Sequence, residues 1–169
     1  MVSEYNVVVI DVETLHSAQD CRHCGMAEEQ HGLHNICETP DLRMIGARHT
    51  PIGWEDHAVL GLSIGCLYRY DTGRYQFFDP HTLEATMRWL VEAQPLLVSF
   101  NGIAFDSNIV STGLQERYPQ STFGSFWHIV EFRNRFEKLW EQSYDILAEC
   151  WVVDPDRKFG HGVNSLGAI

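Results

Sequence analysis

The segment N-V-V-V-I-D-V-E-T, residues 6–14, contains four consecutive β-branched residues followed closely by two acids. The uninterrupted apolar run from Val7 to Ile10 is typical of a strand that is buried on both faces inside a sheet. Asp11 and Glu13 come directly after this run, two residues apart. On an extended chain, this spacing places both carboxylates on one side of the strand, at its end.

Two carboxylates held so close together repel each other unless a cation lies between them. Oxygen ligands on a rigid strand suit a hard ion such as Mg²⁺ or Mn²⁺ better than zinc. The alternative interpretation is an acidic strand end that is exposed to water and has no function. Asp11 and Glu13 are therefore candidate metal ligands whose role depends on what the rest of the chain brings to them.

Length, charge and hydropathy restrict the class of protein. The 169 residues are enough for a hydrophobic core, and we expect a single domain over residues 1–169. No apolar run resembles a membrane span or a signal peptide, so we expect a cytoplasmic protein without a membrane partner. A net charge of −11 without a basic stripe argues against a protein that coats nucleic acid. An enzyme that meets phosphates through bound metal ions is still compatible with this charge.

A Cys- and His-rich insertion follows the first predicted strand and occupies residues 16–57. Hydrophobic periodicity is lost there, and three of the five cysteines of the chain fall within residues 21–37. This distribution favours a metal site over a disulfide framework. The alternative is a loop with reduced thiols, although so long a loop without any cross-link is unusual in a compact domain.

The insertion contains four candidate zinc ligands. Cys21 and Cys24, followed by a glycine, have the form of a zinc knuckle, in which two thiolates from a tight turn bind one ion. His34 and Cys37 provide the second pair, with His31 as the alternative nitrogen ligand. A site with four protein ligands has no open position for water, so we expect this zinc to be structural and not catalytic.

Two further strands and a helix are predicted after the insertion. Residues 58–70 and 75–78 flank a D-T-G-R turn and predict a β-hairpin beside the first strand. Asp79 and the proline after it resemble a helix N-cap and first helical position. Residues 81–93 then carry apolar side chains at helical spacing. This pattern predicts an α/β fold with a mixed sheet flanked by helices.

Residues 95–110, P-L-L-V-S-F-N-G-I-A-F-D-S-N-I-V, contain the third acid of interest. They predict a buried strand over 96–100, a turn at Asn101, and a helix that opens at Asp106. If this strand is parallel to the first one, Asp106 lies near the D-x-E pair, because open α/β sheets build their sites at the carboxyl ends of strands. Taken alone, Asp106 is equally well explained as a helix-start acid.

Two segments of the chain resemble motifs I and II of the DEDD, or DnaQ-like, 3′–5′ exonuclease superfamily. The first motif of that family is a hydrophobic strand that ends in D-x-E, matched by Asp11 and Glu13. The second is Asn, a short spacer, an aromatic residue and Asp, matched by Asn101, Phe105 and Asp106. The resemblance covers essentially all of the chain except the insertion. It implies a ribonuclease H-like fold, a mixed sheet with the zinc-knuckle-like insertion after its first strand.

The resemblance also implies a metal-dependent exonuclease that hydrolyses phosphodiester bonds of DNA or RNA with two Mg²⁺ or Mn²⁺ ions. Asp11, Glu13 and Asp106 would be the catalytic metal ligands. Asn101 and Phe105 would shape the pocket and contact the terminal nucleotide, where an aromatic ring stacks on a base of any kind. The expected partner is the 3′ end of a single-stranded DNA or RNA.

The chain departs from the family after Asp145, which resembles the family's acid that supports the site from outside it. The third motif, a Tyr or His followed by the fourth metal-binding Asp, has no match here. His161 has no acid after it, and Asp154 and Asp156 come too early. Three interpretations are open: a fragment of a longer exonuclease, a protein whose fourth ligand comes from elsewhere, or a catalytically incomplete, zinc-stabilised module that binds nucleic acid or protein.

Overall fold

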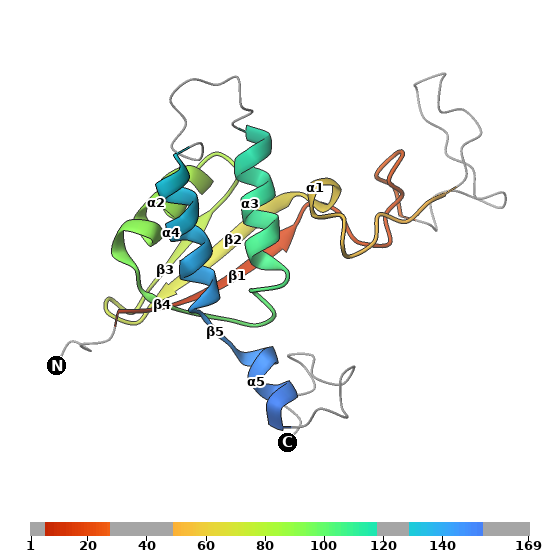
Figure 1. Cartoon of the computed structure of the whole chain (residues 1–169). Coiled ribbons are helices and arrows are strands. Elements are labelled where there is room, and N and C mark those ends of the chain that lie inside the picture. The colour runs from red at the N-terminus through yellow and green to blue at the C-terminus, as the bar shows by residue number, and fades with distance from the viewer. Residues whose placement is uncertain (1–5, 28–48, 118–128, 154–169) are drawn as a thin grey trace.

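The structure is a computed structural model in which residues 6–27, 49–117 and 129–153 are described. They form a mixed α/β fold with one five-stranded sheet (Figure 1). The strands are β1 (Val7–Thr14), β2 (Leu62–Arg69), β3 (Arg74–Phe78), β4 (Leu96–Ser99) and β5 (Tyr144–Asp145). The helices are α1 (His57–Leu60), α2 (Leu83–Ala93), α3 (Asp106–Arg117), α4 (Val130–Glu141) and α5 (Ile146–Val153). None of the helices in these ranges is long and apolar enough to span a membrane.

β1 is the central strand of the sheet, whose order is β3-β2-β1-β4-β5. β2 pairs antiparallel with β1, so that Asp11 lies opposite Cys66, and β3 pairs antiparallel with β2. β4 pairs parallel with β1 on its other side, and β5 pairs parallel with β4. The predicted hairpin and mixed sheet are therefore confirmed. The strand before Asp106 is parallel to the strand that carries Asp11, as the proximity argument requires.

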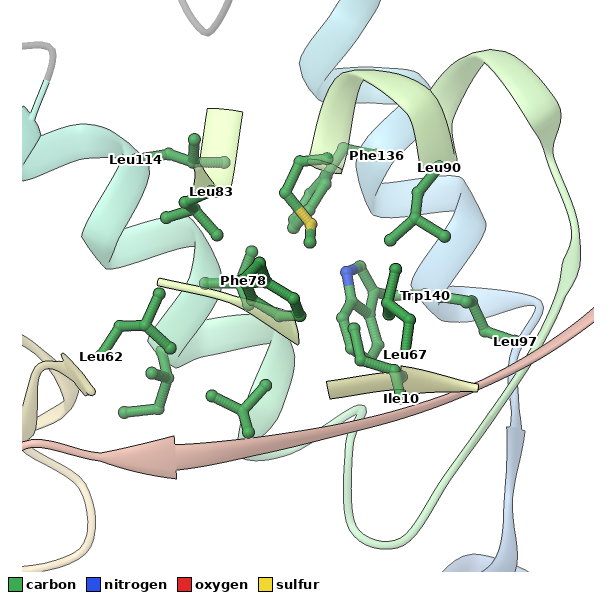
Figure 2. Packing of buried hydrophobic residues seen from close by; sticks show 14 of the residues in the cluster. Ile10, Leu62, Leu67, Phe78, Leu83, Leu90, Leu97, Leu114, Phe136 and Trp140 are labelled. Atoms are coloured by element: carbon green, nitrogen blue, oxygen red, sulfur yellow. The ribbon is translucent and has the colours of Figure 1, made fainter. Parts of the chain in front are cut away.

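α2, α3 and α4 lie together over one face of the sheet (Figure 1). Val8, Ile10 and Val12 of β1 are buried in the hydrophobic cluster on this side. Figure 2 shows side chains from the sheet and from these helices, including Phe78 and Trp140, packed into one core. Burial alternates along β1, so the prediction of a strand buried on both faces is wrong for the described part of the chain. The apolar run is continuous, but the helices cover one face of it.

The opposite face of the sheet, here called the open face, carries mostly apolar side chains from all five strands. Its large apolar residues include Ile64, which is 42% exposed, and Tyr75, which is 69% exposed. Asp11 and Glu13 belong to this face, because the register places them opposite Cys66 and Ile64. By the same register, the open face consists of Val7, Val9, Asp11, Glu13, Ile64, Cys66, Tyr68, Tyr75, Phe77, Leu96, Val98 and Tyr144.

The two ends of the insertion are joined by a neck of backbone hydrogen bonds that continues the pairing of β1 with β2. The N–H of Leu15 donates to the carbonyl of Gly61, and the N–H of His16 donates to the carbonyl of Leu60, both at 3.0 Å. The insertion therefore leaves the sheet and returns to it at adjacent points.

Two helix starts differ from the sequence prediction. Residues 58–60, predicted as the beginning of a strand, belong to α1, because the Asp56 carboxylate caps this turn and Gly61 ends it with a φ of 62°. α2 begins later than predicted because Asp79 does not cap the helix directly. Its carboxylate instead accepts the N–H and the hydroxyl of Thr82, at 2.9 and 2.8 Å, in a turn that precedes the helix.

Gly65 is predicted to be essential for packing between β2 and β3. It lies opposite Phe78, and a Cβ at position 65 would overlap the Phe78 ring. The ring is enclosed by the core, so it can move only by displacing its neighbours. We expect Gly65→Ala to lower the free energy of unfolding by roughly 1–3 kcal/mol, measured by urea denaturation.

Gly113→Ala in α3 is the matched control. The nearest atom to a Cβ there would be a methyl carbon of Leu83 at 3.2 Å, at the end of a flexible side chain. Alanine is favoured over glycine inside a helix by about 1 kcal/mol, which offsets that contact. Gly113→Ala should therefore change stability little, and an equal loss in both variants would contradict the role assigned to Gly65.

Candidate functional site

The three predicted catalytic acids come from β1 and from the start of α3. Asp11 and Glu13 project from the same face of β1 and are exposed, which confirms the side predicted for them. β1 continues to Thr14, so the pair lies within the strand and not after it. Asp106 is the first residue of α3, as predicted, and it is only 3% exposed.

Asp106 is electrostatically coupled to the other acids. Burial raises its pKa to about 7, together with the negative charges of Asp11, Asp145 and Glu13. Its Oδ2 atom is buried and has no hydrogen-bond partner among the residues that the structure describes. A buried carboxylate without a donor and with like charges nearby is costly in its ionised form. A proton or a metal cation at this oxygen removes that cost.

Asp145 holds the turn that carries Asp106. It is 6% exposed, and its carboxylate accepts the N–H of Asn101 at 2.9 Å and the N–H of Ile103 at 3.2 Å. The same carboxylate accepts the N–H of Leu147 at 3.0 Å, at the beginning of α5. Asp145 therefore supports the turn between β4 and α3 from the neighbouring strand, the supporting position suggested by the sequence.

The Asn-Gly pair in this turn is required by the backbone. Asn101 has a φ of 63°, in the left-handed region that Asn adopts more readily than most residues. A Cβ on Gly102 would overlap the side chain of Ser99 and lie 3.1 Å from Trp140. Asn101 thus has a conformational reason for its identity, besides the nucleotide contact predicted for it.

Phe105 belongs to an aromatic group that the sequence reasoning missed. Its ring lies edge-on to Trp54, with centroids 6.0 Å apart, and edge-on to His57 at 5.8 Å. Both partners come from the end of the insertion, so this end lies beside the residue that precedes Asp106. The available sequence signal was a tryptophan in the otherwise polar segment G-W-E-D, residues 53–56.

The first half of the predicted zinc site is described. Cys21 is buried, Cys24 is partly buried, and neither is in a disulfide bond. The N–H of Gly25 donates to the carbonyl of Cys21 at 2.7 Å, and Gly25 has a φ of 70°. This is the tight turn, permitted by glycine, on which the knuckle prediction rests. Three predicted ligands lie outside the described residues: His31, His34 and Cys37.

Within residues 6–27, 49–117 and 129–153, no group of three or more His, Cys, Asp or Glu side chains is arranged to hold a metal ion. The acid site fits Mg²⁺ or Mn²⁺ in the type and the charge of its ligands. Carboxylate oxygens are the ligands such ions prefer, and Oδ2 of Asp106 is an acceptor without a donor.

The raised pKa of Asp106 predicts that the metal-free protein loses stability as the pH rises. Below the ordinary value of 3.8 the carboxyl is protonated in both states, whereas between 3.8 and about 7 only the folded chain holds the proton. Unfolding then releases a proton, so stability falls across this window and the loss is complete above about pH 7. Above about pH 7, the free energy of unfolding of Asp106→Asn should exceed that of wild type by roughly 2–4 kcal/mol, since one pKa unit equals about 1.4 kcal/mol.

The measurement is urea denaturation in chelator, from about pH 4 to about pH 8, the window in which the two states bind protons differently. Glu149→Gln, which neutralises an exposed acid on α5, is the control and should follow the wild-type profile. Parallel pH profiles for Asp106→Asn and wild type would contradict the buried, proton-holding state of Asp106.

Comparison with known proteins leaves the site to be interpreted from its own residues. No protein-family model and no curated protein matches this chain.

Proposed function

We propose that this chain carries the catalytic acids of a metal-dependent 3′–5′ exonuclease that hydrolyses phosphodiester bonds of DNA or RNA. The observation that carries the proposal is the environment of Asp106. A buried structural acid normally has a donor or a cation as its partner. Asp106 instead has an oxygen without a donor and a pKa raised to about 7 by burial and by three other acids. Groups perturbed in this way concentrate at functional sites.

The arrangement of the sheet supports a ribonuclease H-like fold within this proposal. The strand with the D-x-E pair is central, the hairpin lies on one side of it, and the strand before Asp106 lies on the other. This is the order of elements that the two sequence motifs imply. The parallel pairing of β1 with β4, in which Val98 lies opposite Val9, brings the carboxyl end of β4 close to Asp11 within β1.

Each residue of the candidate site has a specific role in the proposed reaction. Asp11, Glu13 and Asp106 would hold the ions, and the bound ions would supply an activated water molecule and stabilisation of the leaving oxygen. Asp145 fixes the turn in front of Asp106, and Phe105 faces the terminal nucleotide. A working two-ion site would need a fourth acid from another segment or subunit. The bound ions also offset the negative charge of the chain, so that a phosphate backbone can approach.

A second candidate function is a zinc-stabilised module that binds nucleic acid or protein without cleaving it. One observation favours it: the described acids do not form a group that could hold a metal ion. The two candidates differ in their dependence on Asp11. An exonuclease needs the Asp11 carboxylate, whereas a binding module is indifferent to its loss.

The exonuclease proposal predicts metal-dependent shortening of a 5′-labelled single-stranded oligonucleotide from its 3′ end. DNA and RNA are tested in parallel, with Mg²⁺ or Mn²⁺ and with chelator. Asp11→Asn keeps the size of the side chain and removes its charge. The rate should fall by about 100-fold or more, because a catalytic metal ion contributes several kcal/mol to transition-state stabilisation.

Glu92→Gln, an exposed acid on α2, is the matched control and should keep the wild-type rate. A ladder that persists in Asp11→Asn would contradict the assigned ligand. No degradation by folded, metal-supplied wild-type protein, together with binding that survives Asp11→Asn, would replace the exonuclease with the binding module.

We also propose that the insertion binds one structural zinc ion through Cys21, Cys24, His34 and Cys37. Metal analysis of protein purified without chelator tests this. We expect a single zinc ion per chain, lost in Cys21→Ser and Cys24→Ser, with a lower Tm because the ion closes a long loop. The shift should be about 2–4 °C for each kcal/mol lost. Cys66→Ser, on β2, is the control and should retain zinc. Wild-type protein without zinc would remove this part of the proposal.

A further inference from the structure

We propose that Trp54 is a stacking platform for a base near the 3′ end of the bound strand. The inference rests on the proposed function and adds a binding residue to it. Trp54 is 64% exposed, although tryptophan is on average one of the more buried residues. Its ring contacts Phe105 by an edge-to-face arrangement with an interplanar angle of 66°. That contact anchors the indole but leaves most of its surface exposed to solvent.

The position of Trp54 relates it directly to the acids. Phe105 immediately precedes Asp106, and its ring is packed partly against the hydrophobic cluster. Trp54 and His57 lie edge-on to that ring. A strand end held at Asp106 would therefore have an indole within reach of one of its last bases.

The segment around Trp54 is held on both sides. The N–H of Gly53 donates to the carbonyl of Ala18 at 2.9 Å. The guanidinium of Arg22 donates to the Asp56 carboxylate at 2.8 Å and to the carbonyl of Ile52 at 3.2 Å. These bonds connect the two legs of the insertion on either side of residue 54. A ring fixed before binding loses less conformational freedom when a ligand stacks on it.

The charges nearby indicate which part of a nucleotide the ring would receive. Trp54 is followed by Glu55 and Asp56, and its ring partner Phe105 is followed directly by Asp106, whose pKa is raised in part by Asp11 and Glu13. The guanidinium of Arg22, which binds the carbonyl of Ile52 in the same segment, is engaged with Asp56 at 2.8 Å. A phosphate is disfavoured in these surroundings, whereas a neutral base is not. Stacking on an aromatic ring also tolerates any base, as an exonuclease requires.

The test measures affinity of the full chain for a single-stranded oligonucleotide with phosphorothioate linkages at its 3′ end, which resist hydrolysis. Fluorescence anisotropy is recorded in Mg²⁺. Trp54→Ala should weaken binding about 10-fold, since stacking contributes about 1–3 kcal/mol per base and about 1.4 kcal/mol is tenfold. Trp54→Phe should retain most of the affinity. Trp54→Leu, which is apolar but has no aromatic face, should behave like Trp54→Ala.

A second oligonucleotide carries abasic sites in its last positions. The two proteins and the two oligonucleotides then form a double-mutant cycle. The abasic sites should weaken binding by wild-type protein about 10-fold more than they weaken binding by Trp54→Ala, because the variant has already lost its stacking at residue 54, whereas a contact made by Phe105 is lost in both. Trp151→Ala on α5 removes another exposed tryptophan and should bind as wild type does. With a cleavable substrate, Trp54→Ala should raise KM about 10-fold at unchanged kcat, the result of removing an interaction made equally in the ground and transition states.

The outcomes separate this inference from the exonuclease proposal. Degradation by wild type, with unchanged affinity and KM in Trp54→Ala, would overturn the stacking role and leave the enzyme. Binding that depends on Trp54, without degradation, would keep the stacking role and favour the binding module. Equal binding of Trp54→Leu and wild type would reject stacking in favour of simple apolar contact.

Discussion

The carboxylate of Asp145 connects the edge of the sheet to the turn on which the candidate site is built. It accepts N–H groups from Asn101 and Ile103 on one side, and from Leu147 on the other. Hydrogen bonds from backbone donors to a charged acceptor are stronger than those between neutral groups. Without this acceptor, donors in a half-buried turn would be left unsatisfied. The position of Asp106 therefore depends on Asp145, a residue of β5, which lies much later in the sequence.

The same acid also makes the ionisation of Asp106 more costly. Its negative charge contributes to the raised pKa of Asp106, together with burial, Asp11 and Glu13. Asp145, which holds the turn in front of Asp106, thus disfavours the ionised form of Asp106. A bound cation would offset this repulsion. A site of this kind sacrifices stability of the empty protein for readiness to bind positive charge. In the proposed enzyme, ion binding and proton release from Asp106 would be linked.

The sequence predicts those features that follow from local patterns. The shared side of Asp11 and Glu13, the hairpin, and the helix start at Asp106 need only strand alternation and turn chemistry, and all three are confirmed. Burial of β1 on one face was missed because it depends on where the helices pack. The contact of Phe105 with Trp54 was missed because it joins residues from separate segments through tertiary packing. The zinc site and the exonuclease activity stay predictions, because they depend on bound ions and on a substrate, which the fold of the chain does not specify.

The neck of the insertion has a consequence for how this protein can vary. Leu15 and His16 are tied to Gly61 and Leu60, so the loop between them is closed whatever its length. The entropy of closing a loop grows only with the logarithm of its length, about 0.6 kcal/mol for each doubling. Changes in the length of the insertion should therefore cost little free energy, provided that the predicted zinc ligands are kept. The segment that carries Trp54 is bonded to Ala18 and Arg22, so it would keep its place against Phe105 while the length of the insertion changes.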